Sequence, residues 1–307
     1  GVTVIVPRED EIRKDYCCAG IHTFNGNGEM TGSHWIEASG LLTSPIALTN
    51  TYSVGVVHDA LIEWGITRHG GGYGLPVAAE TWDGRLNDIR AFHVTKEHLF
   101  AAMENAGPGP VDEGNVGGGT GMICHDFKGG IGTSSRLVET PSSAFTVGVL
   151  VQTNYGDRQQ LRIDGVPVGQ QIDDSRVPLA FDQRPDGSSI IVILATDAPL
   201  IPAQCKRLAQ RATVGLARTG GAGHDGSGDI FLAFATGNHI PAEAEAPIAL
   251  QMLPNYQMDI LFEAAAEATE EAILNALVAA KTMTGFQGRT VYAMPIDMVR
   301  DLVARTD

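Results

Sequence analysis

The chain has 307 residues, of which 43% are hydrophobic and 19% are charged, and its formal net charge is −15. This composition fits a globular protein with a large core, and the acidic balance without a basic stripe argues against nucleic acid as a partner. The apolar runs are about as long as a strand, far short of the roughly 20 residues that span a bilayer. We therefore expect a soluble protein without a membrane partner.

The numbered sequence begins at Gly1, without Met and without an apolar signal stretch. It therefore resembles a fragment or a processed product, in which a targeting segment would not be visible. The compartment, cytoplasmic or periplasmic, stays open on this basis.

Three segments in the first third of the chain predict regular structure. Residues 2–6 (VTVIV) predict a short buried strand. Residues 53–66 change from β-branched residues to helical spacing, which predicts a strand passing into a helix. Residues 95–105 predict a helix with Thr95 as its N-cap.

The second half of the chain alternates strand and helix patterns. The predicted strands are the apolar runs at 145–152, 190–195 and 230–236. The predicted helices are 202–220, ended by Gly220-Gly221, and 257–281, and a turn-rich loop is expected at 182–189. No internal repeat divides the sequence, so we expect one domain, 1–307, with a layered α/β core.

A glycine-rich block runs from Glu113 to Arg136 and contains VGGGTGM at 116–122. That stretch raises the hypothesis of a nucleotide-binding or regulatory protein. It lacks the Lys-Ser/Thr of a P-loop and the G-x-G-x-x-G of a dinucleotide site. Glycines that let the backbone approach a neighbour closely explain the block better.

Neither cysteine nor histidine spacing predicts a metal or another cofactor. The four cysteines form no C-x-x-C pair, and free thiols are expected. The nine histidines include no H-E-x-x-H arrangement. We therefore expect a protein with no metal site and no cofactor.

Ser227 stands between Gly226 and Gly228, just ahead of the apolar run Ile230–Phe234. It is not a nucleophile elbow, because G-x-S-x-G would need glycine where Asp225 and Asp229 stand. Cleavage of the Gly226–Ser227 bond would activate the serine differently. The freed α-amine, with a reference pKa of about 7.7–8.0, could act as base for its own hydroxyl. From local chemistry alone a simple turn is the better explanation, because Gly-Ser-Gly turns are common.

Several segments occur together in a characteristic order. They are LLTSPIALTNTYSVGVVHDAL, EGNVGGGTGMICHDFKGGIGTSSR, VGVLVQTNYGDR, ATDAPL, GSGDIFLAF and EATEEAILNAL. In this combination the chain resembles, over nearly its whole length, the DmpA family of L-aminopeptidase/D-amidase-esterases and β-peptidyl aminopeptidases.

The resemblance implies an N-terminal-nucleophile-hydrolase-like fold, a four-layer αββα sandwich with its own connectivity. It implies self-cleavage before Ser227 into residues 1–226 and 227–307, which stay associated. The activity implied is release of N-terminal amino acids, α or β, from small peptides, amides or esters. A homo-oligomer, a tetramer of αβ units, is also implied.

The resemblance also assigns roles to single residues. Ser227 would be the nucleophile, and Glu267 would orient or tune its amine. Relatives that act on β-peptides have a serine where this chain has Ala265, so a serine-assisted relay is in doubt. Glu113 would hold the substrate ammonium group, for which a charge-assisted bond is suited. Asn154 would donate to the oxyanion.

Local patterns leave alternatives for these residues. Helical spacing places Glu267 in line with Ile260, Ala264, Leu274 and Val278, which predicts that it leans toward the packed face. Glu113 could instead cap the glycine loop, and Asn154 could make a turn before Gly156. A second function stays open in the same fold group: an endo-acting amidase on linear oligoamides, of the nylon-oligomer-hydrolase kind, which uses Thr as nucleophile.

Overall fold

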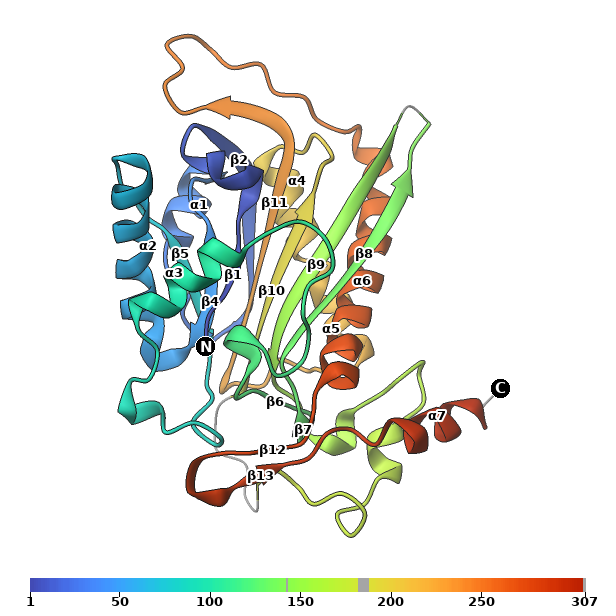
Figure 1. The fold of residues 1–307 in the computed structure, drawn as a ribbon. Helices are drawn as coiled ribbons and strands as arrows, with labels where there is room; N and C mark the ends of the chain where they lie inside the picture. The colour runs from blue at the N-terminus through green and yellow to red at the C-terminus, as the bar shows by residue number, and fades with distance from the viewer. Residues whose placement is uncertain (142, 182–187, 306–307) are drawn as a thin grey trace.

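The computed structural model describes residues 1–141, 143–181 and 188–305. Two sheets pack against each other between two outer layers of helices (Figure 1). The smaller sheet has the order β1-β4-β5, comprising β1 (Thr3–Ile5), β4 (Ile46–Asn50) and β5 (Val77–Thr81). Its outer face is covered by α2 (Val54–His69) and α3 (Lys96–Asn105).

The larger sheet has six strands in the order β3-β2-β11-β10-β9-β8. They are β3 (Leu41–Leu42), β2 (Asp15–Gly26), β11 (Ser227–Pro241), β10 (Ser188–Thr196), β9 (Ala144–Asn154) and β8 (Ile131–Glu139). Its outer face carries α4 (Pro202–Ala209), α5 (Ala212–Arg218) and α6 (Met258–Ala279). The predicted four-layer αββα sandwich is confirmed.

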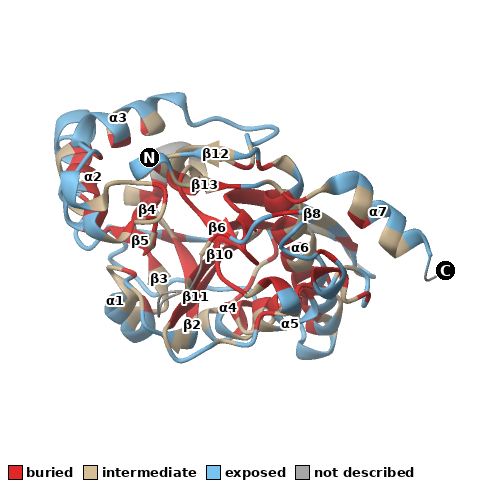
Figure 2. Ribbon diagram, turned by 90° about the horizontal axis from the view of Figure 1, so that it is seen from below, coloured by how far each residue is buried: buried red, intermediate tan, exposed pale blue. Residues whose placement is uncertain are grey.

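Smaller elements complete the chain. They are α1 (Ser33–Ser39), β6 (Ile123–Cys124), β7 (Phe127–Lys128), β12 (Met283–Thr284), β13 (Thr290–Val291) and α7 (Ile296–Ala304). Figure 2 shows the buried strands enclosed by helices with exposed outer faces. Among the described residues, no helix combines the length and the apolarity that crossing a membrane requires.

Alternate residues of the six-stranded sheet feed two separate cores, because successive side chains of a strand point to opposite faces. On β11, Ile230 and Leu232 pack toward the three-stranded sheet, whereas Phe231 and Ala233 pack toward α4, α5 and α6. This alternation decides which side of the sheet each polar residue near Ser227 can reach.

Most predicted elements are confirmed, with three differences. The strand expected at the start of 53–66 is helix, since α2 already begins at Val54 and the strand before it is β4. The helix expected over 202–220 is two helices, because Gln210 and Arg211 turn the chain between them. Among the strands of the two main sheets, β2, β3, β4, β5 and β8 were not predicted. Of the expected loop 182–189, residues 182–187 lie outside the described ranges, and 188–189 belong to β10.

The glycine-rich block lies close against its neighbours, as expected. A Cβ on Gly118 would stand 2.1 Å from Gln152 Oε1, and one on Gly132 would stand 1.9 Å from the Ala272 carbonyl oxygen. Only glycine tolerates such an approach. The nearby Lys128 is fully buried and donates to the carbonyl oxygens of Gly119, Met122 and Gly129, at 3.2, 3.0 and 2.7 Å.

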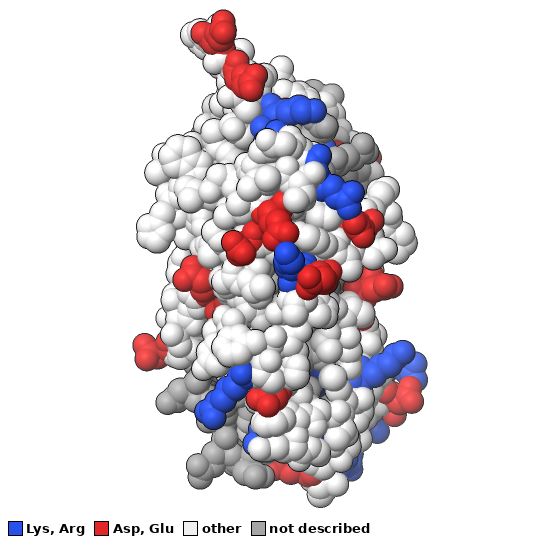
Figure 3. All heavy atoms as spheres, turned by 60° about the vertical axis from the view of Figure 1, so that its left-hand side comes forward, with Lys and Arg blue, Asp and Glu red and all other residues white. Residues whose placement is uncertain are grey.

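The outer face that carries α2 and α3 is mixed in charge. Figure 3 shows basic side chains on this face standing singly or in small groups between acidic ones. The four cysteines are buried and form no disulfide, as the sequence predicts.

Candidate active site

Ser227 is the first residue of the central strand β11, and its side chain is buried, with 1% exposed. Parallel pairing sets it beside Ser188 on β10, whose hydroxyl donates to Ser227 Oγ at 2.9 Å. Asp229, two residues on, shares the same face of the strand, because side chains alternate. Ser227 Oγ donates to Asp229 Oδ1 at 2.6 Å. The hydroxyl is therefore held between a donor and a carboxylate acceptor.

Burial raises the pKa of Asp229 from 3.8 to about 6. The hydrogen bond from Ser227 is the largest opposing effect, because it favours the charged carboxylate, and His224 contributes a smaller one. A carboxyl group with this pKa exchanges its proton near neutral pH. That property suits a group that accepts and returns a proton.

Two asparagines at and just after the end of β2 donate to carbonyl oxygens around the Gly226–Ser227 bond. Asn27 Nδ2 donates to the Gly226 carbonyl oxygen at 2.9 Å, and its backbone N–H donates to the Ser227 carbonyl oxygen at 3.1 Å. Asn25 Nδ2 donates to the carbonyl oxygens of Asp225, at 2.9 Å, and of Ser227. The amide N–H of Ser188 also points at the Gly226 oxygen, at 3.4 Å.

Glycines bring β2 and β11 close enough for these contacts. Gly26 pairs with Gly228, and a Cβ on Gly228 would stand 2.7 Å from the Asn27 carbonyl oxygen. The predicted glycine hinge is therefore also a contact surface for β2. The Ser227 N–H donates to the His224 carbonyl oxygen at 2.8 Å, which closes a turn immediately before the strand.

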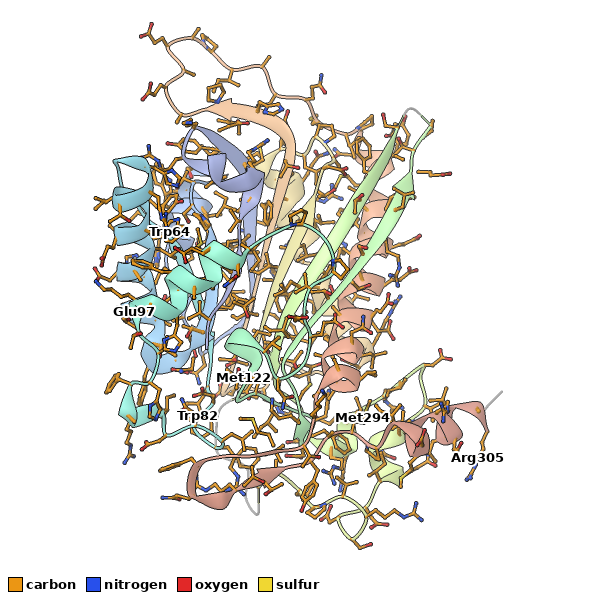
Figure 4. The ribbon with its side chains drawn as sticks, in the orientation of Figure 1. Trp64, Trp82, Glu97, Met122, Met294 and Arg305 are labelled. Atoms are coloured by element: carbon orange, nitrogen blue, oxygen red, sulfur yellow. The ribbon has the colours of Figure 1, made fainter. Side chains whose placement is uncertain are left out.

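Asn154 lies at the same end of the sheet, paired with Ser189, but on the opposite face from Ser227. Its Nδ2 donates to the Trp82 carbonyl oxygen at 2.8 Å, and its Oδ1 accepts the Ile123 N–H at 2.9 Å. In Figure 4, Trp82 and Met122 mark this lower end of the sandwich. Within the described part of the chain, one Asn154 amide hydrogen is left for another acceptor, and Ser227 must turn to approach it.

Glu267 is not brought to Ser227 within this chain. It is on the exposed side of α6, with 52% of its side chain accessible, and pairs with Arg136 Nε at 3.2 Å. Its partner Arg136 is paired with Val147 on β9. Val147 is seven residues along β9 from Asn154, which marks the Ser227 end of the sheet, so Glu267 lies about 23 Å from that end. The prediction that Glu267 leans toward the packed face of α6 was wrong, because the buried face is formed by other positions of the helix. Val278 is 52% exposed, whereas Ala265 is buried.

Glu113 is also distant from Ser227. Its Oε1 accepts the backbone N–H and the hydroxyl of Thr133, at 2.6 and 2.7 Å, so it ties the glycine-rich loop to β8. Thr133 pairs with Leu150, four residues along β9 from Asn154, and β8 lies three strands from β11. The separation is about 13 Å along the strands and about 14 Å across them.

The sequence analysis missed two buried acidic residues, Glu80 in β5 and Asp83 just after it. Glu80 on β5 is 4% exposed and accepts the Glu29 N–H at 3.0 Å and the Thr51 hydroxyl. A Cβ on Gly28 would stand 3.3 Å from Glu80 Oε1 and 3.0 Å from Gly228 Cα, so Glu80 is close to the residue after Ser227.

The second of them, Asp83, is 5% exposed and accepts from Asn87 at 3.1 Å. Burial raises the pKa of both carboxyl groups. A glutamate in the otherwise buried strand VAAET was the signal that could have found this pair, because an unpaired carboxylate is costly inside a protein.

The described residues hold no group of three or more His, Cys, Asp or Glu side chains placed to bind a metal ion. The chemistry available at this end of the sheets is that of one serine hydroxyl, buried carboxyl groups and amide donors. These are the parts of a nucleophilic hydrolase.

Comparison with known proteins identifies the family. Residues 1–291 match peptidase family S58. The beta-peptidyl aminopeptidases BapA of Sphingosinicella microcystinivorans and Sphingosinicella xenopeptidilytica are 47% and 43% identical to it. The alignments cover 99% and 97% of this chain and 80% and 78% of those proteins.

Solved structures agree. A Burkholderia sp. beta-aminopeptidase matches with a TM-score of 0.93 at 50% identity, covering 99% of this chain and 86% of its own. The L-aminopeptidase D-Ala-esterase/amidase of Ochrobactrum anthropi matches with a TM-score of 0.92 at 43% identity, covering 100% and 85%. It is described as a prototype for the serine aminopeptidases and a new variant of the Ntn hydrolase fold.

Fold and site together define a hydrolase of the N-terminal-nucleophile type. The chain belongs to peptidase family S58, the DmpA family, and it is an aminopeptidase. The resemblance noted in the sequence is thereby confirmed. The endo-acting amidase is not favoured, since these relatives are aminopeptidases.

Proposed function

We propose that this chain is a self-processing serine aminopeptidase that cuts its own Gly226–Ser227 bond and then uses Ser227 as an N-terminal nucleophile. The observation that carries the proposal is the buried Ser227 hydroxyl at the start of the central strand, held by Ser188 and Asp229. The cut would leave residues 1–226 and 227–307 associated, because β11 pairs with β2 and β10 on either side.

In the cut form, the Ser227 α-amine would act as the base for its own hydroxyl. Its reference pKa of about 7.7–8.0 leaves a useful neutral fraction near pH 7–8. Release from Gly226 also frees the Ser227 backbone to turn toward the space between the sheets. There Asn154, with its remaining amide hydrogen, would donate to the oxyanion of the substrate.

The substrate ammonium group needs a carboxylate at a fixed distance from the scissile carbonyl. Glu80 supports this role better than Glu113, because it lies beside the Gly28–Gly228 contact, next to the residue that follows Ser227. Glu113 is instead satisfied by Thr133. We therefore assign the ammonium site to the Glu80 side of the sandwich.

The substrates proposed are small peptides, amides or esters with a free N-terminal amino group. The name beta-peptidyl aminopeptidase of two relatives supports the proposal that β-amino acids are accepted at that position. A panel of α- and β-aminoacyl p-nitroanilides, each with an N-acetylated counterpart, tests this. Hydrolysis only of the free amines is expected, and equal rates on capped substrates would contradict an aminopeptidase.

Intact-mass analysis tests self-processing. The wild-type protein should give two pieces that separate before Ser227, and Ser227→Ala should leave one inactive chain. A wild-type protein that stays in one piece and is active would overturn the proposal.

We also propose that the αβ units assemble into a homo-oligomer, a tetramer by analogy with the family. Residues 242–257 project beyond the sheets (Figure 1) and expose apolar side chains, among them Leu250, Met252 and Tyr256, at 42%, 48% and 76%. Such a surface favours burial against another copy. Light scattering after size exclusion should give a multiple of the 32.5 kDa chain; a monomer at micromolar concentration would contradict it.

A further inference from the structure

We infer that this chain carries separate groups for cutting itself: Asp229 takes the proton from Ser227, and Asn27, with the amide of Ser188, stabilises the oxyanion that forms on Gly226. This inference rests on the proposed function, because it concerns how the Gly226–Ser227 bond breaks. Apart from Ser227 itself, it assigns this first reaction to residues other than those proposed for substrate turnover.

The uncut chain needs a base that the cut enzyme does not. In the cut form the Ser227 α-amine can accept the hydroxyl proton, but before the cut that nitrogen is an amide without basicity. A neighbouring side chain must therefore take the proton. Asp229 Oδ1 already accepts the hydrogen of Ser227 Oγ at 2.6 Å, within the range for a general base.

The environment of Asp229 fits that role. It is 1% exposed, and burial raises its pKa to about 6. The group is half ionised near pH 6 and largely ionised above pH 7, yet it is more basic than an ordinary carboxylate. Ser188 donates its hydroxyl hydrogen to Ser227 Oγ at 2.9 Å, which leaves the Ser227 hydrogen directed at Asp229.

The carbonyl group under attack is polarised at its oxygen. The Gly226 oxygen accepts from Asn27 Nδ2 at 2.9 Å and from the Ser188 N–H at 3.4 Å. Ser188 begins β10 and Asn27 directly follows β2, the two strands that flank β11, so both donors are in place before the reaction begins. Donors already aimed at an oxygen that gains negative charge are the basis of an oxyanion hole.

The step balances without any further reagent. Ser227 Oγ bonds to the Gly226 carbonyl carbon through a five-membered ring while its proton passes to Asp229. The C–N bond then breaks, and the proton moves from Asp229 to the Ser227 nitrogen, leaving an ester. Water hydrolyses the ester, which yields the Gly226 carboxylate, the free Ser227 hydroxyl and the free amine.

Water can reach the ester for that last reaction. Asn27 and the loop residues His224 and Asp225 are exposed, whereas Ser227 and Asp229 are buried. Water can therefore approach the ester carbonyl from the Asn27 side, while the carboxyl group that moves the proton stays out of bulk water.

The experiment follows self-cleavage of the full chain made by cell-free synthesis, sampled over time by denaturing gel and intact mass. Asn27→Ala should slow conversion about 100- to 1000-fold, the range for loss of one oxyanion donor. Asp229→Asn should slow it about 100- to 10,000-fold, the range for loss of a general base.

Asn25→Ala is the matched control. Asn25 holds the carbonyl oxygens of Asp225 and Ser227 but not that of Gly226, so its loss loosens the same loop without removing an oxyanion donor. We expect a much smaller effect than for Asn27→Ala. Equal slowing by the two variants would show that Asn27 only restrains the loop, and would overturn its assignment.

The wild-type pH profile covers the case in which Asp229→Asn fails to fold. The cleavage rate of the wild-type chain should rise with pH through about 6 and then level, because Asp229 must be ionised to accept the proton. A rate that is flat between pH 5 and 7 overturns the role of Asp229. The proposed function would then stand, whereas a wild-type chain that neither splits nor hydrolyses substrate would remove both.

Discussion

The central strand of the large sheet and the helix α6 that covers it hold carboxylates in opposite environments. At the start of β11, Asp229 is buried beside Ser227, and burial raises its pKa to about 6. On α6, Glu271 lies at the surface, where hydrogen bonds from Ser134 and Arg136 lower its pKa. The same functional group is thus a proton carrier at one place and a permanent anion at the other, and desolvation makes the difference.

The comparison also explains why Glu267 suits a role beside Ser227 less well than Asp229 does. It lies one turn from Glu271 on the same exposed face and shares Arg136 with it. Side chains in that position are solvated, and a single ion pair there contributes little to stability. The tests below are ordered from the largest expected effect to the smallest.

Removing the buried charge should stabilise the uncut chain at alkaline pH. Because the folded-state pKa of Asp229 is raised, its favourable contribution is full below pH 4 and is lost as the pH rises through about 6. A difference of about 2 pKa units corresponds to about 3 kcal/mol. On a Ser227→Ala background, adding Asp229→Asn should raise the free energy of unfolding by about that much at pH 8 and little at pH 4.

Urea unfolding at the two pH values measures this effect. Equal stability of the single and double variants at pH 8 would mean that burial does not destabilise the ionised Asp229 carboxylate. Glu271→Gln on the same background is the control and should show no such pH dependence.

Neutralising Glu80 should impair substrate binding. If Glu80 holds the substrate ammonium group, Glu80→Gln loses a hydrogen bond to a charged group, which is worth about 1.5–3 kcal/mol. The value of kcat/KM on a free aminoacyl p-nitroanilide should fall about 10- to 150-fold. Glu113→Gln, which loses only its bonds to Thr133, should change it much less; the reverse order would return the ammonium site to Glu113.

Lys128 is a buried basic residue, and burial affects its pKa in the opposite direction from that of Asp229. Burial lowers the pKa of Lys128 to about 7, so its stabilising contribution is lost as the pH falls toward 7. Lys128→Met leaves three carbonyl oxygens without their donor and should cost about 1–3 kcal/mol. Thermal unfolding should show a larger deficit at pH 9 than at pH 6, and a deficit independent of pH would contradict the shifted pKa.

Replacing the exposed carboxylate, Glu271, should change the free energy of unfolding least. Glu271→Gln removes one ion pair with Arg136 and one hydrogen bond from Ser134. Exposed pairs are worth about 0.2–1 kcal/mol. Added salt should abolish the difference from the wild-type protein, and a loss above 2 kcal/mol would show that this surface cluster is structural.

Local pattern predicted α3 with its Thr95 cap, and the strands β9, β10 and β11, which are marked by long apolar runs. It failed for β2 and β8. In β2 a glycine and two buried cysteines replace the usual alternation, and β8 begins inside the glycine-rich block. It failed for Glu267 because α6 is rich in alanine, so the phase of its buried face is poorly marked in the sequence.

The sequence by itself determined the nucleophile candidate, the glycine hinge and the family, because these rest on neighbouring residues and on their order along the chain. Only the tertiary structure decided which groups surround Ser227. Asn27 reaches the Gly226 oxygen across 199 positions of sequence, and Ser188 meets Ser227 by strand pairing. Contacts between distant segments, and the desolvation that makes Asp229 basic, exist only once the sheets have packed.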